Sequence, residues 1–146
     1  TKDLQRYKMY ASDTGLFITL AFKSKSFTDN VIYQKLLSDK LDANLGYVYE
    51  NVVAQMLKAS GKDLYYHTIL KLDGKGYYEI DFLLSDGSKV SPIEVKSSGY
   101  KAHTSLDKFS EKYSSRIAHK YLVYTKDLKK DGDTLCVPIY MVPLLP

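Results

Sequence analysis

The stretch from residue 77 to residue 96 constrains the fold most, because charged and apolar residues alternate along two arms joined by a turn. Its first arm carries Glu79 and Asp81, and its second arm carries Glu94 and Lys96. Side chains of a β-strand alternate between its two faces, so we expect each of these charged pairs to share a face. The apolar side chains between them are expected to point the other way, into a core: Ile80, Phe82, Ile93 and Val95.

The bulk properties fit one soluble domain. The chain has 146 residues, which is enough for one domain with a sizeable core and too few for two comfortable ones. No apolar run approaches the roughly 20 residues that a membrane-spanning helix needs, and no signal peptide is recognisable, so we expect no membrane partner. The single cysteine, Cys136, fits a reducing compartment and predicts a cytoplasmic location.

We expect a single domain over residues 1–146. It divides into an N-terminal extension (1–41), a core (42–125) and a C-terminal strand region (126–146). The chain begins at Thr1 without an initiator methionine, which suggests a fragment of a longer protein.

Before the hairpin, the pattern predicts a short strand over 8–16, a short apolar helix over 16–22 and a second helix over 29–37. The strongest helical pattern runs from about residue 42 to residue 60, and Gly61 follows where a left-handed C-terminal cap would lie. Its apolar residues recur at intervals of three and four and form one stripe: Leu45, Val48, Tyr49, Val52, Val53, Met56 and Leu57.

After the hairpin, the pattern predicts a helix with Thr104 as its N-cap and then an interior strand over 120–125. The crossover from the second hairpin arm through this helix makes the two flanking strands parallel. The buried stripe of the helix should contain three residues: Leu106, Phe109 and Tyr113.

Further strands are expected over 64–72 and 134–142, with a charged loop over 125–133. Pro138 suggests that the last strand lies at a sheet edge or is irregular. The fold class is therefore α/β, with an αβββαβ core in which helices flank a central mixed β-sheet.

The acidic residues of this core suggest a metal site. If the hairpin packs on the helix over 42–60, then Asp81, Glu94 and Lys96 converge at one end of the sheet, and Glu50 approaches from the helix. Mg²⁺ prefers oxygen ligands and binds through one or two carboxylates and substrate phosphate. Lys96 would stabilise negative charge, so the pattern fits metal-assisted phosphodiester hydrolysis.

This pattern, Glu50 followed by Asp81 and by Glu94-Val95-Lys96, resembles the PD-(D/E)XK nuclease superfamily, which includes restriction endonucleases. The resemblance implies a restriction-endonuclease-like fold with Glu50, Asp81, Glu94 and Lys96 at the catalytic positions. The first three would hold Mg²⁺ or Mn²⁺, and DNA would be the partner. The chain departs from the pattern at Ile80, where the superfamily name expects a proline.

Almost the whole chain is similar to one family, the C-terminal domains attached to prokaryotic AAA-type ATPases. Four blocks carry this resemblance, at residues 8–16, 46–55, 79–82 and 93–98. It implies an ATPase domain in cis, because the sequence contains no Gly-x-x-x-x-Gly-Lys phosphate loop and hence no nucleotide site.

Other functions stay open. The domain could instead be a non-catalytic module that recognises nucleic acid or protein and regulates the ATPase, or a structural cap for ATPase assembly. Glu79 is interpreted as an outer or solvated carboxylate. Several basic residues after the hairpin either line a phosphate-binding surface or form an ordinary solvated helix face: Lys101, Lys108, Lys112, Arg116 and Lys120.

The three histidines lack the spacing of zinc ligands, so surface or packing roles are favoured for them. A nucleophilic-serine mechanism is disfavoured, because no histidine is suitably placed. Cys136 is interpreted as a small buried apolar residue.

Overall fold

The computed structural model describes residues 7–22, 34, 45–98 and 102–146. The expected helix over 29–37 lies largely outside these residues. The helices and strands, in chain order, are α1 (Thr14–Phe22), α3 (Leu45–Ala59), β1 (His67–Leu70), β2 (Tyr77–Ile80), β3 (Phe82–Asp86), β4 (Lys89–Val95), α4 (Thr104–Tyr113), η1 (Ser114–Arg116), β5 (Lys120–Tyr124), β6 (Lys129–Asp131), β7 (Thr134–Pro138) and η2 (Ile139–Leu144).

The main sheet has five strands in the order β3-β4-β5-β7-β6. β3 and β4 form the expected antiparallel hairpin, whose turn contains Gly87 with a positive φ of 61°. β4 and β5 are parallel, so the predicted crossover through α4 is confirmed. The sheet is therefore mixed and helices cover it, which confirms the predicted α/β class.

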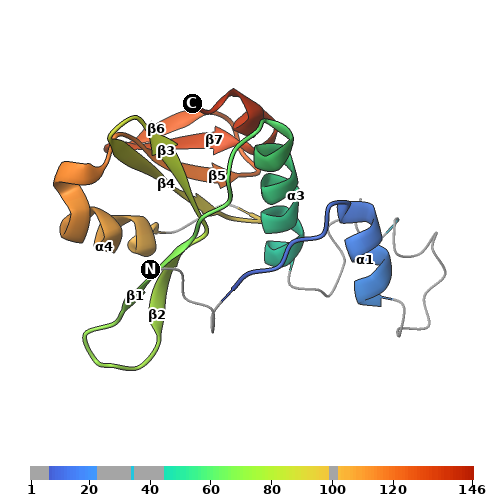
Figure 1. Ribbon diagram of the computed structural model, residues 1–146, viewed down its shortest axis with the longest axis horizontal. Coiled ribbons are helices and arrows are strands. Elements are labelled where there is room, and N and C mark those ends of the chain that lie inside the picture. The colour runs from blue at the N-terminus through green and yellow to red at the C-terminus, as the bar shows by residue number, and fades with distance from the viewer. Residues whose placement is uncertain (1–6, 23–33, 35–44, 99–101) are drawn as a thin grey trace.

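Two hydrophobic clusters fill the two faces of this sheet. Val53, Ala54 and Leu57 of α3 pack with side chains from β3, β4, β5 and β7 in one cluster. Leu106 and Phe109 of α4 pack in the other cluster. Figure 1 shows the result, with α3 and α4 on opposite sides of the strands.

The expected first hairpin arm is interrupted at Asp81. β2 pairs with β1 in a separate two-stranded sheet, and β3 belongs to the main sheet. Ile80 packs in the cluster beside α4, whereas Phe82 packs in the cluster beside α3. The prediction that these two side chains point the same way was wrong, because the backbone leaves the regular strand conformation between them.

The helix predictions hold with small shifts. Gly61 has a φ of 77° after the end of α3, which confirms the predicted left-handed cap. Thr104 is the first helical residue of α4 and not its N-cap, which is His103. Leu106 and Phe109 are buried as predicted.

Three strand predictions need correction. Residues 8–13 form no strand, because their polar groups bond to side chains of α3, as described below. The expected loop over 125–133 contains the edge strand β6, which pairs with β7. β7 therefore lies between β5 and β6, and Pro138 does not mark a sheet edge. The strand ends at Pro138 and the short helix η2 follows.

No helix in the described ranges is both long and apolar enough to span a membrane. Cys136 is fully buried on β7, as expected for a small apolar residue.

Candidate metal centre

Three carboxylates meet where the two-stranded sheet joins the main sheet. Glu50 comes from α3, Glu79 from β2 and Asp81 from the junction between β2 and β3. One carboxylate oxygen of each residue lies within 4.8 Å of one from each of the others. We call these three residues the carboxylate cluster. Glu50 and Asp81, which are 31 positions apart along the chain, are thus close enough to share one ion.

Asp81 is held in the cluster by the main chain of the neighbouring strand. Its Oδ2 accepts a hydrogen bond of 2.8 Å from the backbone N–H of Val95 on β4. This side-chain bond accompanies the interruption of the strand and fixes the carboxylate at the strand junction. The same residue therefore shapes the backbone and presents a carboxylate oxygen to the cluster.

Lys8 lies among the three carboxylates. Its Nζ is 2.5 Å from Glu50 Oε1, 2.6 Å from Glu79 Oε1 and 3.4 Å from Asp81 Oδ1. Tyr10 donates a hydrogen bond of 2.5 Å to the same Oε1 of Glu50. The cluster therefore holds three negative charges against one positive charge.

Burial and charge shift the protonation of these groups. Burial, followed by the charge of Glu50, raises the pKa of Asp81 to about 6, although the Val95 N–H and Lys8 act in the opposite direction. Burial alone would lower the pKa of Lys8, but hydrogen bonds to Glu50 and Glu79 outweigh it and raise that pKa above its ordinary value. Lys8 is therefore an ammonium at neutral pH.

Tyr10 also titrates outside its usual range. Burial, together with the hydrogen bond and charge of Glu50, raises the pKa of Tyr10 well above its ordinary value. The phenol is therefore a permanent hydrogen-bond donor to Glu50. Its ring packs against Phe82 with a centroid separation of 5.5 Å, which anchors Tyr10 to the core.

Glu94 on β4 and Lys96, which directly follows that strand, form a second charged group. Lys96 Nζ lies 2.6 Å from Glu94 Oε1, and the Glu94 side chain is only 7% exposed. Glu94 alternates with Ile93 and Val95, which pack on the α3 face, so its side chain points to the other face of the sheet. This explains why Glu94 is not a member of the carboxylate cluster, although its charge contributes to the raised pKa of Asp81.

The chemistry of the cluster fits a divalent cation. All its ligands are carboxylate oxygens, which hard cations such as Mg²⁺ prefer. A divalent charge would also relieve the repulsion between Asp81 and Glu50. Outside the cluster, on the other face of the sheet, Glu94 Oε2 is buried and has no hydrogen-bond partner. An unsatisfied buried carboxylate oxygen is costly, and a cation or a water that it binds would satisfy it.

The predicted site residues therefore fall into two groups. The structure brings Glu50 and Asp81 together, and it pairs Glu94 with Lys96. Glu79, which we interpreted as an outer carboxylate, is a full member of the cluster and is 45% exposed. The catalytic roles of the four predicted residues stay predictions.

Lys8 and Tyr10 were missed as site residues. No local spacing could reveal them, because Lys8 contacts acids that are 42 and 73 residues away. The only available signal was their place in the N-terminal block of the family resemblance.

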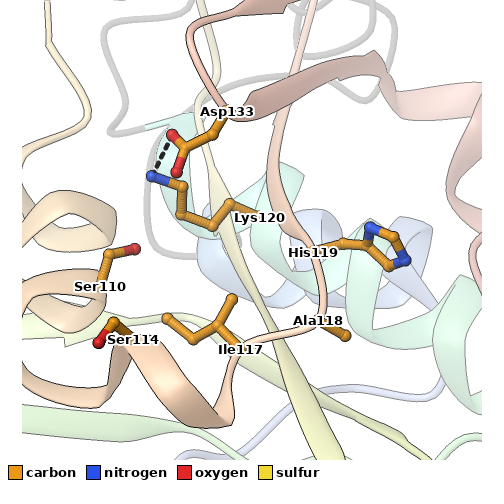
Figure 2. Close-up of a pocket in the computed structure, with 7 residues that line it drawn as sticks. All are labelled: Ser110, Ser114, Ile117, Ala118, His119, Lys120 and Asp133. Carbon is orange, nitrogen blue, oxygen red and sulfur yellow. Dashed lines mark ion pairs between the residues drawn. The ribbon is translucent and has the colours of Figure 1, made fainter.

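A pocket of about 230 Å³ lies away from this centre, between α4 and the start of β5 (Figure 2). Lys120 extends into it and forms an ion pair with Asp133. The Lys120 side chain is 7% exposed, so it does not belong to an exposed basic surface. Lys108 pairs with Glu111 at 2.8 Å, as expected for a solvated helix face.

Two of the three histidines have packing or surface roles, and the third, His103, contacts Asp107 at 2.9 Å. His67 stacks edge-on against Phe109 and Tyr113, and burial followed by the charge of Lys112 lowers the pKa of His67. His119 is largely exposed. Among the described residues, the one group of three metal-capable side chains contains no histidine.

Fold and site together define a mixed α/β domain with a semi-buried carboxylate cluster. Residues 45–142 match the family described as Domain of unknown function (DUF4143), and the chain belongs to this family. The match begins at α3 and ends in η2, so it contains all three acids of the cluster but not Lys8. Neither a curated protein nor a solved structure matches the chain.

Proposed function

We propose that this domain is a metal-dependent, nuclease-like domain that binds nucleic acid and cleaves phosphodiester bonds in DNA. The proposal includes a restriction-endonuclease-like fold, an AAA-type ATPase in cis and a cytoplasmic location. The order of α3, β1, the interrupted strand β2–β3, β4, α4 and β5 supports it, since it follows the expected αβββαβ core. The family is also found in proteins associated with AAA-type ATPases.

One observation carries the proposal. Glu50 on α3 is far along the chain from Glu79 and Asp81, and oxygens of the three nevertheless lie within 4.8 Å of one another, with Glu50 and Asp81 mostly buried and Glu79 45% exposed. Burial, followed by the charge of Glu50, raises the pKa of Asp81, so keeping this carboxylate ionised costs stability. Such arrangements are typical of functional sites, where stability is reduced for the sake of chemistry.

The residues can be assigned roles in hydrolysis. Glu50, Glu79 and Asp81 would hold the cation. A bound Mg²⁺ or Mn²⁺ would activate water and neutralise charge on the phosphate. Lys96 is 38% exposed, so its ammonium can reach from Glu94 to a phosphate oxygen. Glu94 would orient Lys96.

Cleavage of plasmid DNA with Mn²⁺ or Mg²⁺ tests this proposal. We expect nicking by the wild-type domain, loss of at least about a hundredfold in Asp81→Asn, and a similar loss in Lys96→Met, because each removes a charge from the reacting site. Asp63→Asn is the matched control, since Asp63 is an exposed carboxylate on the surface beyond α3. Nicking that persists unchanged in both site variants would exclude hydrolysis at this centre.

A second function is favoured by a specific observation. Lys8 already places a positive charge among the three carboxylates, which is the arrangement expected of a stable ion-pair network. On this alternative, the domain recognises nucleic acid or protein without cleaving it. DNA binding that weakens with salt and is equal in wild type and Asp81→Asn, without nicking in either protein, would support the alternative.

A further inference from the structure

The segment over residues 8–14 is attached to α3 through side chains and not through a β-ladder. The amide of Asn51 accepts a hydrogen bond of 2.8 Å from Ala11 N and donates one of 3.1 Å to Ala11 O. One turn later, Gln55 Oε1 accepts a hydrogen bond of 2.9 Å from Thr14 Oγ1. Figure 1 shows this segment passing beside α3 before α1 begins. α3 therefore sets the position of the segment residue by residue.

This attachment delivers the Lys8 ammonium to the carboxylate cluster. Lys8 and Tyr10 both donate to the same oxygen, Glu50 Oε1. Lys8 Nζ also lies 2.6 Å from Glu79 Oε1, and its side chain is 19% exposed. The oxygens that a cation would use are thus already bonded to groups of the N-terminal segment.

We propose that Lys8 is an internal competitor of the divalent cation, held in the carboxylate cluster by residues 8–14 and displaced when the cation binds. The inference rests on the proposed cation site and adds a control mechanism to it. In the metal-free protein the ammonium neutralises part of the cluster charge, and it must leave before the cation can enter.

The two cations exclude each other for geometric and electrostatic reasons. Mg²⁺ binds oxygen at about 2.0–2.1 Å and requires near-octahedral surroundings. An ammonium 2.5 Å from one oxygen and 2.6 Å from a second occupies the space between those oxygens. Two positive charges within a few ångströms also repel strongly in a partly buried place. One site therefore admits either Lys8 or the metal ion.

Mn²⁺ affinity, measured by calorimetry or by electron paramagnetic resonance, tests the inference without any activity assay. Lys8→Met should bind Mn²⁺ at least about tenfold more tightly than wild type, because the competing charge is gone. Lys8→Arg, which keeps the charge, should bind like wild type or more weakly. Lys58→Met is the matched control, since it removes an exposed lysine of α3 that pairs with Asp63, and its affinity should be unchanged.

Hydrogen exchange in the wild-type protein provides a second measurement that needs no variant. If the cation displaces Lys8, then saturating Mn²⁺ should speed exchange in the peptide containing Ala11, whose N–H bonds to Asn51. Slower or unchanged exchange with Mn²⁺ bound would overturn the inference. So would equal Mn²⁺ affinity in wild type and Lys8→Met, or no binding in either protein.

These results separate the inference from the proposed hydrolysis. Mn²⁺ binding that tightens in Lys8→Met but is never accompanied by DNA cleavage would reject hydrolysis and keep the competition. The opposite result is loss of DNA cleavage in Asp81→Asn together with equal Mn²⁺ affinity in wild type and Lys8→Met. That result would support hydrolysis and reject the competition.

Discussion

Asp81 has to satisfy two opposing demands. Its buried carboxylate accepts the Val95 N–H at the strand junction, and it also lies beside another acid. The N–H and Lys8 favour the ionised form, whereas burial and Glu50 disfavour it more strongly, so the pKa of Asp81 rises from 3.8 to about 6. Ionised Asp81 therefore makes the folded protein less stable than a neutral group of the same shape would.

This shift predicts a pH-dependent gain in stability for Asp81→Asn. The raised pKa gives the wild type a stabilising contribution that is fully present below about pH 4 and is lost as pH rises through 6. The asparagine variant avoids this loss and can still accept the Val95 N–H. In the absence of metal it should be more stable than wild type at pH 7, by at most about 3 kcal/mol.

Urea unfolding at pH 4 and at pH 7 checks this expectation. The difference between the two proteins should nearly vanish at pH 4, and Asp63→Asn should show no such trend. A difference that is the same at both pH values would contradict the assigned shift. Combined with lost cleavage, greater stability would mark Asp81 as a functional residue.

At the scale of elements, α3 does more than cover the sheet. Its apolar face fills the core, while its polar positions Glu50, Asn51 and Gln55 bind the N-terminal segment. Asn51 is only 2% exposed and forms three hydrogen bonds to that segment, the third to Thr14 Oγ1 at 2.9 Å. The helix thus aligns the segment with the carboxylate cluster.

Asn51→Ala should therefore destabilise the domain by about 2–3 kcal/mol, because three hydrogen bonds are lost and buried groups of Ala11 are left unpaired. Gln55→Ala is the control, since Gln55 is exposed and its loss should cost less than about 1 kcal/mol. Chemical denaturation of both variants measures the effect. Equal and small losses would show that Asn51 does not hold the segment.

Regular patterns predicted α1, α3, α4 and most strands of the described residues, and contacts between distant residues account for the elements that the patterns missed. The stripe of α3 and the apolar run of β5 follow directly from periodicity. The alternation rule failed at Asp81, where a side chain takes over a main-chain hydrogen bond. β6 was missed because its sequence, Lys-Lys-Asp, is short and charged, and only pairing with β7 makes it a strand.

The sequence likewise predicted some residues of the candidate site and missed others. Glu50 and Asp81 were found because the family resemblance places acids on a helix and on a neighbouring strand. Glu94 was expected beside them, but alternation on β4 turns it to the opposite face. Glu79 has a residue type and spacing that also suit a solvated strand position, so only the tertiary contact with Glu50 and Lys8 reveals its place.

For the whole molecule, the proposed cation site would link ion binding to folding. A ligand that binds only the folded state stabilises it by about 2.7 kcal/mol at a concentration of 100 times its Kd. Mn²⁺ should therefore raise the melting temperature in a concentration-dependent way, and an excess of chelator should reverse the change. The shift should disappear in Asp81→Asn, where one ligand charge is missing. An identical shift in both proteins would place the bound ion elsewhere.

The interrupted strand has a mechanical consequence. Glu79 belongs to the small sheet of β1 and β2, which projects from the main sheet in Figure 1, whereas Glu50 belongs to a helix packed on the main sheet. Asp81 is the junction between the two sheets. Any displacement of the small sheet would therefore change the separation of Glu79 from Glu50, and with it the shape of the carboxylate cluster.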